Sequence, residues 1–221
     1  GCDGRDNQQS ACRVEYYPPR VQRPMTWRPV GLSRDLPAAR VMRAWVDGQD
    51  AVVWRSTSGV LNAWDNRCPH RGMALSHGFV RGENLACLYH GWHYSCEGGG
   101  CSLIPSHPDL TPPDTIKTRA FEAAEAEGVI WVRLEGSPEL SPPTSGPGLE
   151  PLRSLEMRAS EGDIAHGCAA KPFEAANLSL LFNPIAHDRT LVTVLIDASA
   201  ETEQRKQASR WCEDVRREVE A

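Results

Sequence analysis

Two short segments of the chain each combine one cysteine with one histidine. Residues 68–72 read CPHRG, and residues 87–92 read CLYHGW. A cysteine thiolate and a neutral imidazole are both good metal ligands, so each segment can offer one sulfur and one nitrogen. Two loops of this composition can therefore supply a mixed set of two sulfurs and two nitrogens to one metal centre.

This ligand set matches an asymmetric [2Fe–2S] cluster, in which two cysteines bind one iron and two histidines bind the other. The candidate ligands are Cys68, His70, Cys87 and His90. Glycines in both segments let the backbone approach a cluster closely. The alternative is a structural zinc ion, but zinc fingers place two cysteines close together and two histidines close together, not one of each in two loops. The spacing favours the iron–sulfur cluster.

The two segments resemble the ligand loops of Rieske iron–sulfur proteins, in particular those of the Rieske non-haem iron oxygenases of the ring-hydroxylating and demethylase types. In the respiratory branch of that family each loop carries an extra cysteine, and the two form a disulfide. Met73 and Tyr89 occupy those positions here. The resemblance therefore implies the oxygenase branch, with a potential toward the low end of the Rieske range of about −150 to +300 mV.

The resemblance also assigns roles and limits to the domain. It implies that the two cysteines bind a buried iron and that the two histidines bind an outer iron near the surface. Further segments resemble the oxygenase branch, namely WRPVG at 27–31, DNR at 65–67, LIP at 103–105 and GVIWV at 128–132. Together they imply a Rieske domain over residues 25–136.

The elements that must position these loops are short β-like runs separated by glycine turns such as Asp47-Gly48 and Ser58-Gly59. We expect strands at Ala38–Val46, Ala51–Ser56, Val60–Asp65, Asn84–Leu88 and Val129–Leu134. The predicted fold is mainly β, a Rieske-type antiparallel β-sandwich with a cluster-binding subdomain. Residues 1–24 are polar and predict an N-terminal arm, and the Pro/Gly-rich residues 137–149 predict a linker.

Residues 150–221 predict a small α+β unit. We expect strands at Ser154–Ala159, Asp163–Ala169, Ser179–Phe182 and Thr190–Asp197. A helix is predicted over residues 200–221. Ser199 is the expected cap, and Glu201 with Arg205 and Glu213 with Arg217 are expected to pair along its surface.

This second unit resembles the end of the catalytic domain of full-length Rieske oxygenases, where two histidines and a carboxylate hold a mononuclear iron. Asp163 and His166 fit the first half of that motif. Lys171 and Pro172 stand where the second histidine should be, and His187 follows only later. We therefore expect a shortened remnant of the catalytic domain, without mononuclear Fe(II) and without a catalytic residue.

The other histidines and cysteines receive simpler interpretations. We expect His77 and His93 to hydrogen-bond or to lie at the surface. Cys96 and Cys101 flank a glycine run that would allow a disulfide or a second metal site, but reducing surroundings favour free thiols. No partner pattern is found for the remaining cysteines, Cys2, Cys12, Cys168 and Cys212.

Composition excludes several classes of function. The chain has 24 Lys and Arg against 29 Asp and Glu, a net charge of −5, which argues against nucleic-acid and anionic-membrane binding and suits basic redox partners. Its apolar runs are far shorter than the roughly 18 residues of a membrane helix. The first residues lack the pattern of an export signal, so we expect a cytoplasmic protein.

These observations lead to one preferred hypothesis and two alternatives. We expect an electron-transfer subunit or component of a Rieske oxygenase system that passes single electrons from a flavin or ferredoxin reductase to an oxygenase subunit carrying the mononuclear iron. One alternative is a compact monooxygenase or demethylase whose own atypical iron site uses His166, His187 and a carboxylate. The other is a non-catalytic assembly subunit.

Overall fold

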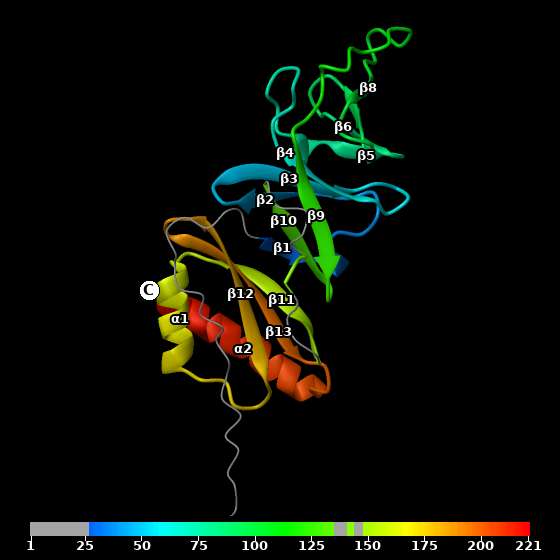
Figure 1. Cartoon of the computed structure of the whole chain (residues 1–221). Helices are drawn as coiled ribbons and strands as arrows, with labels where there is room; N and C mark the ends of the chain where they lie inside the picture. The colour runs from blue at the N-terminus through cyan, green and yellow to red at the C-terminus, as the bar shows by residue number, and fades with distance from the viewer. Residues whose placement is uncertain (1–26, 135–140, 144–147) are drawn as a thin grey trace, which may run out of the picture.

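The computed structural model describes residues 27–134, 141–143 and 148–221, and it is mainly β, as predicted. Figure 1 shows a β unit above a smaller unit in which two helices cover one face of a sheet. The arm predicted for residues 1–24 and most of the predicted linker lie outside the described residues. Among the described residues, no helix is long and apolar enough to cross a membrane.

The β unit consists of two antiparallel sheets. The larger has the order β1-β10-β9-β4-β3-β2, with β1 (Arg28–Leu32), β2 (Val41–Val46), β3 (Gln49–Arg55), β4 (Leu61–Asp65), β9 (Ala120–Ala126) and β10 (Val129–Arg133). The smaller has the order β5-β6-β7-β8, with β5 (Phe79–Arg81), β6 (Asn84–Ala86), β7 (His93–Ser95) and β8 (Cys101–Leu103). Two short 3-10 helices, η1 (Ser33–Asp35) and η2 (Leu75–His77), follow β1 and β4.

Strand β3 links the two hydrophobic cores of this unit. Successive side chains of a strand point to opposite faces of its sheet. Ala51 and Val53 pack into the core enclosed by the larger sheet, whereas Val52 and Trp54 pack toward the smaller sheet. All four are fully buried, so this strand reads as a continuous apolar run and holds the smaller sheet against the larger one.

The second unit is a three-stranded antiparallel sheet of order β11-β13-β12. Its strands are β11 (Leu149–Met157), β12 (Leu178–Ala186) and β13 (Arg189–Asp197), and its helices are α1 (Glu161–Ala170) and α2 (Thr202–Val219). The strand predicted for Asp163–Ala169 is wrong, because these residues belong to α1. Their buried members are Ile164, Gly167 and Cys168, whose spacing of three and four residues is that of one helical face.

The start of α2 and its surface pairs also differ from the prediction. Glu201, not Ser199, caps the helix, and its side chain and that of Gln204 form a reciprocal capping box. Ser199 instead donates from its backbone and its hydroxyl to Asp197, which holds it in the preceding turn. The predicted side-chain pairs are replaced by other ones. Arg205 pairs with Glu150 and Glu213 pairs with Arg153, both outside the helix. Within the helix, Arg217 pairs with Asp214 and Glu213 also pairs with Arg216.

The two units share a small core and several hydrogen bonds, including those from Arg34 to the Pro151 and Leu152 backbone oxygens. Leu32, Trp131 and Leu195 pack together between β1, β10 and β13. Beside this core, the Asn183 side-chain amide of β12 donates to the Trp45 backbone oxygen of β2 over 2.9 Å. The second unit is therefore packed against the end of the larger sheet that lies away from the smaller one (Figure 1).

Candidate metal centre

The two predicted ligand loops have the same backbone structure. In the first, the Cys68 amide donates to the Met73 oxygen over 2.8 Å, and the Gly72 amide donates to the Cys68 oxygen over 2.8 Å. In the second, the Cys87 amide donates to the Trp92 oxygen over 2.9 Å, and the Gly91 amide donates to the Cys87 oxygen over 3.0 Å. In each loop, the backbone amide and oxygen of the cysteine thus both hydrogen-bond to residues later in the same loop.

The glycine four residues after each cysteine makes this closure possible. Gly72 has φ 75° and Gly91 has φ 69°, both in the left-handed region that glycine enters without a steric penalty. At Gly91 a larger side chain would also be crowded, because a Cβ there would lie 3.3 Å from Pro105, which follows β8. The LIP segment at 103–105 therefore lies directly against the second ligand loop.

The two cysteines form the buried end of the site. Cys68 and Cys87 are 3% and 2% exposed, and they pack in one core with Tyr94. The Cys68 sulfur lies 3.1 Å from the Tyr94 hydroxyl, and the Cys87 sulfur interacts with backbone amides of Tyr89 and His90. Burial and the neighbouring Cys68 raise the pKa of Cys87, which means that two thiolates here need compensating positive charge.

The two histidines form the outer end. Their Nδ1 atoms face each other at 3.2 Å, and the His70 ring stacks on Trp92 at 4.0 Å with an angle of 6°. Tyr89 packs against the His90 ring at 3.8 Å. Desolvation lowers the pKa of His70, and the positive charges of His90 and Arg71 lower it further. For His70 the neutral imidazole, the form that binds metals, is therefore favoured.

The arrangement fits a cluster that bridges the two ends. Two ring nitrogens that face each other at 3.2 Å need either a shared proton or a metal between them, and two buried thiolates need a cation. A [2Fe–2S] cluster with two cysteine and two histidine ligands would meet both needs.

The remaining cysteines of the described residues form no disulfide. Cys96 lies 3.8 Å from a Glu83 carboxylate oxygen, and Cys101 lies 3.8 Å from the Leu103 backbone oxygen. Cys168 and Cys212 are buried in the core of the second unit. Cys2 and Cys12 lie outside the described residues.

The residues of the possible mononuclear site are arranged differently from the motif. His166 is exposed on α1, His187 is exposed in the turn between β12 and β13, and the Asp163 amide donates to the Ser160 hydroxyl that caps α1.

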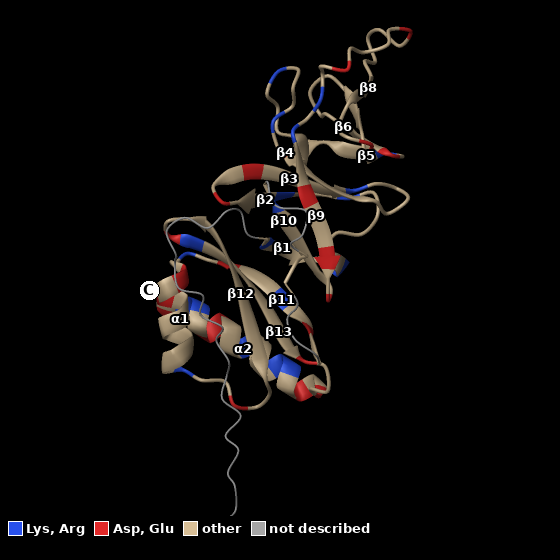
Figure 2. Ribbon diagram, viewed as in Figure 1, with Lys and Arg blue, Asp and Glu red and all other residues tan. Residues whose placement is uncertain are grey.

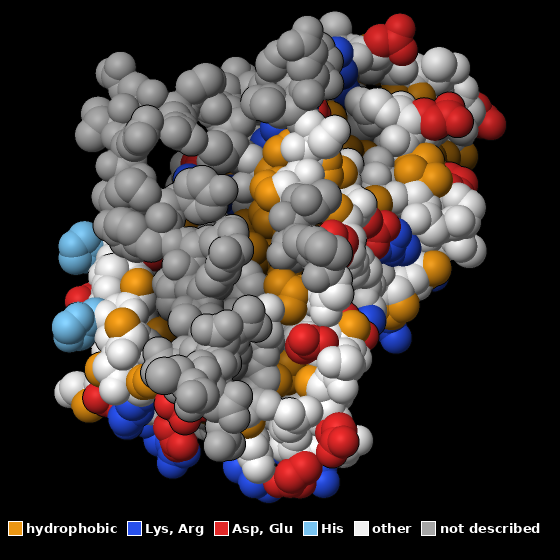
Figure 3. All heavy atoms as spheres, turned by 60° about the horizontal axis from the view of Figure 1, so that its bottom comes forward, with side chains coloured by type: hydrophobic (Ala, Val, Ile, Leu, Met, Phe, Trp, Pro, Cys, Tyr) orange, Lys and Arg blue, Asp and Glu red, His pale blue; other side chains and the backbone are white. Residues whose placement is uncertain are grey.

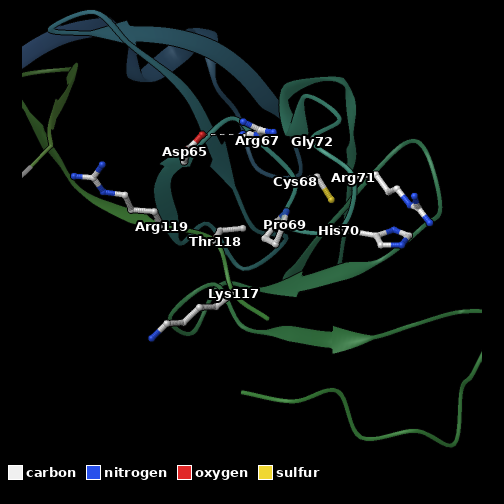
Figure 4. Close-up of a pocket in the computed structure, with 10 residues that line it drawn as sticks. All are labelled: Asp65, Arg67, Cys68, Pro69, His70, Arg71, Gly72, Lys117, Thr118 and Arg119. Carbon is white, nitrogen blue, oxygen red and sulfur yellow. Dashed lines mark hydrogen bonds between the residues drawn. The ribbon is translucent and has the colours of Figure 1, made fainter. Parts of the chain in front are cut away.

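Two features of the site were missed in the sequence. Tyr94, two residues beyond Trp92 on β7, places its hydroxyl against a predicted ligand, and its position in a strand next to the loop was the available signal. The other feature is a cavity of about 500 Å³ beside the first ligand loop (Figure 4). Its lining residues are Asp65, Arg67, Cys68, Pro69, His70, Arg71, Gly72, Lys117, Thr118 and Arg119.

Comparison with known protein families finds a match for most of the β unit. Residues 26–119 match the family model described as the Rieske [2Fe-2S] domain. The chain carries a Rieske domain. This confirms the resemblance seen in the two ligand loops, and a Rieske domain implies a [2Fe–2S] cluster.

Relatives in sequence are components of oxygenase systems. The chain is 43% identical over 112 residues to the oxidoreductase NdmD of Pseudomonas putida, which is 51% of this chain and 19% of that protein. It is 32% identical over 142 residues to the phthalate 4,5-dioxygenase oxygenase subunit of Pseudomonas putida, 62% of this chain and 32% of that subunit. The chain thus spans at most about a third of the length of these relatives.

Solved Rieske oxygenases share the fold over more of the chain. The structure of NdmA from Pseudomonas putida CBB5 matches with a TM-score of 0.66 and 19% identity, covering 89% of this chain and 81% of that one. A match of that extent must include part of the second unit, since the β unit ends near residue 134. The second unit therefore has a fold found in Rieske oxygenases.

Proposed function

We propose that this Rieske protein is an electron-transfer component of an oxygenase system, with Cys68, Cys87, His70 and His90 as the cluster ligands. The observation that carries the proposal is the convergence of the two loops. Their sulfurs lie in a buried core, and their imidazoles lie at the outer end beside exposed residues. A [2Fe–2S] cluster bound there supplies one-electron transfer.

The protein's own groups would serve this role in distinct ways. The buried core around Cys68 and Cys87 excludes water from the sulfurs, while the Tyr94 hydroxyl offers a hydrogen bond. At the outer end, Leu88 and Tyr89 are 54% and 58% exposed and flank His90. Exposed apolar side chains beside a ligand provide a contact surface for a redox partner. We infer a flavin or ferredoxin reductase as donor and an oxygenase subunit with the mononuclear iron as acceptor.

The proposed domain limits follow the same division. The Rieske domain would occupy residues 25–136, and residues 150–221 would form the remnant of an oxygenase catalytic domain. The likeness to NdmA across most of the chain supports that origin for the second unit. The packing of Asn183 against Trp45 would hold the remnant on the Rieske domain when the rest is absent.

An anaerobic titration tests the proposal. The chain should accept one electron per cluster from dithionite and pass it within seconds to an oxidised acceptor such as cytochrome c. The Cys87→Ser variant should do neither, because it lacks a sulfur ligand. A chain that binds iron and sulfide but neither accepts nor donates electrons would contradict the proposal and favour an assembly subunit.

A second function is favoured by the likeness of the second unit to solved oxygenases, namely a compact monooxygenase or demethylase. In that case His166 and His187 would hold a further iron. The His166→Ala and His187→Ala variants separate the two functions. Unchanged iron content and unchanged electron transfer support the carrier. Loss of one iron per chain, or loss of oxygen-dependent turnover by the isolated chain, would establish the oxygenase.

A further inference from the structure

The charged side chains that line the cavity beside the first ligand loop are mostly basic. Four of its lining residues, Arg67, Arg71, Lys117 and Arg119, are basic and exposed, against the single carboxylate of Asp65. His70 and Cys68 line the same cavity. Figure 4 shows Arg71 beside His70 on the ligand loop, with Lys117 and Arg119 on the neighbouring segment. We call these four basic residues the cationic rim.

The fold assembles the rim from two distant segments. Strands β4 and β9 pair in the larger sheet, with Trp64 opposite Ala120. Just before β9, the Arg119 backbone oxygen accepts a hydrogen bond from the Asp65 amide over 2.9 Å. This pairing extends the segment of Lys117 along the start of the first ligand loop. The rim is therefore fixed by sheet structure and not by the loop alone.

The charges of the rim are unusual for this chain. Elsewhere basic side chains are mostly paired, as in Arg28 with Asp47 and Arg55 with Glu125, and Figure 3 shows acidic and basic groups close to one another. Within the described part of the chain, Arg67, Arg71 and Lys117 form no ion pair. Figure 2 shows basic residues gathered near the end of β4.

The like charges of Arg67, Arg71 and Lys117 repel one another, so this arrangement does not serve stability. The whole chain carries −5, and the rim reverses that sign at the outer end of the metal centre. The earlier expectation that net charge suits basic partners describes the average surface only. The partner that reaches His70 meets a positive surface.

We propose that the cationic rim is the docking surface for an acidic electron-donor protein, an inference that rests on the proposed electron-transfer function. A protein surface fits better than a small anion, because each basic side chain of the rim is exposed and no charged side chain is buried in the cavity. Complementary charge steers association and sets orientation. The acidic partner would approach His70, one of the proposed ligands, directly.

The test measures binding without electron transfer. Oxidised plant-type [2Fe–2S] ferredoxin, an acidic protein, is titrated into the oxidised holoprotein at low salt. The Arg71→Glu/Lys117→Glu double variant should weaken this binding at least about tenfold, and the difference should shrink at high salt, as expected for steering between opposite charges. Arg40→Glu, an exposed arginine outside the cavity, is the matched control and should change the affinity less than twofold.

Several outcomes separate this inference from the proposed function. Equal affinity of the double variant and the wild type would overturn the docking surface. Binding of millimolar inorganic phosphate at the rim that leaves ferredoxin binding unaffected would also overturn it, because the rim would then bind a small anion and not the protein. In both cases dithionite would still reduce the cluster. If dithionite reduces no cluster in the wild type, the electron-transfer function itself fails. The EPR spectrum of the double variant must match the wild type, so that a disrupted ligand loop is not mistaken for lost docking.

Discussion

The Tyr94 hydroxyl lies 3.1 Å from the sulfur of Cys68, and both side chains are buried. With a thiolate at Cys68, the hydroxyl becomes the donor, because a thiolate has no proton to give. A hydrogen bond to a ligand sulfur stabilises the more electron-rich state of a cluster and is one of the factors that set its potential. We therefore predict that Tyr94 raises the potential of the proposed cluster.

Replacement of Tyr94 by Phe should lower the reduction potential. Loss of a hydrogen bond worth about 1 kcal/mol more in the reduced state corresponds to roughly 40 mV for one electron. Protein-film voltammetry measures the shift. Tyr89→Phe is the matched control, because Tyr89 is exposed and packs its ring on His90. A potential of Tyr94→Phe equal to or above that of the wild type would remove the assigned role.

The ligand assignment predicts a change of cluster type in the histidine variants. His70→Cys and His90→Cys place a thiolate where a neutral imidazole stood, which adds negative charge and lowers the potential. The characteristic EPR spectrum of the mixed-ligand cluster should be lost. Cys96→Ser and Cys101→Ser should keep it, since both thiols lie outside the proposed ligand set. Loss of the cluster in either serine variant would mean that the wrong cysteines were assigned.

Acid stability should depend on Glu125. Both guanidinium nitrogens of Arg55 bind its carboxylate, at 2.7 and 2.9 Å, and these bonds lower the pKa of Glu125. A lowered pKa contributes stability above the unfolded value of about 4.3, and this contribution is lost as the pH falls through the folded value. Glu125→Gln should therefore cost about 1 kcal/mol at neutral pH and almost nothing in strong acid.

Urea unfolding at neutral pH and near pH 3 checks this dependence. Glu174→Gln, at an exposed position in the second unit, provides the control and should give the same unfolding free energy as the wild type at both pH values. A constant difference between Glu125→Gln and wild type across the pH range would show that the ion pair is not the cause.

The contact between the two units should contribute to their joint stability. Asn183→Ala removes the 2.9 Å hydrogen bond to the Trp45 oxygen and leaves that buried acceptor unpaired, which should cost about 1–3 kcal/mol. Tryptophan fluorescence during urea unfolding measures the loss. Asn177→Ala, with an exposed side chain on the same unit, should have little effect. Equal midpoints for both variants would mean that the interface contributes nothing.

The sequence allowed prediction of the parts in which local pattern and structure agree. The loops around Cys68 and Cys87 each place a glycine four residues after the cysteine, and the structure uses this spacing for the same two hydrogen bonds. Strands β3 and β13 are predictable because they are short apolar runs bounded by turns. The Rieske domain was therefore visible without a structure.

Other features depend on contacts that a sequence pattern does not contain. Helix α1 has two glycines and a weakly amphipathic surface, so its helical state is set by packing of Gly167 against Val219 of α2. The cationic rim combines residues of the first ligand loop with Lys117, and only the pairing of β4 with β9 brings them together. The net charge of −5 suggested a negative surface and basic partners, whereas the cationic rim is positive. The net charge sums over the whole chain, including the paired groups elsewhere, and does not describe this one surface.

The most direct test of the account is a joint analysis of iron, acid-labile sulfide and the EPR spectrum of the reduced chain. The proposed ligands predict two irons and two sulfides per chain and the low average g value that two histidine ligands give a [2Fe–2S] cluster. One zinc ion per chain without sulfide, or the spectrum of a cluster held by four cysteines, would contradict the assignment of Cys68, His70, Cys87 and His90.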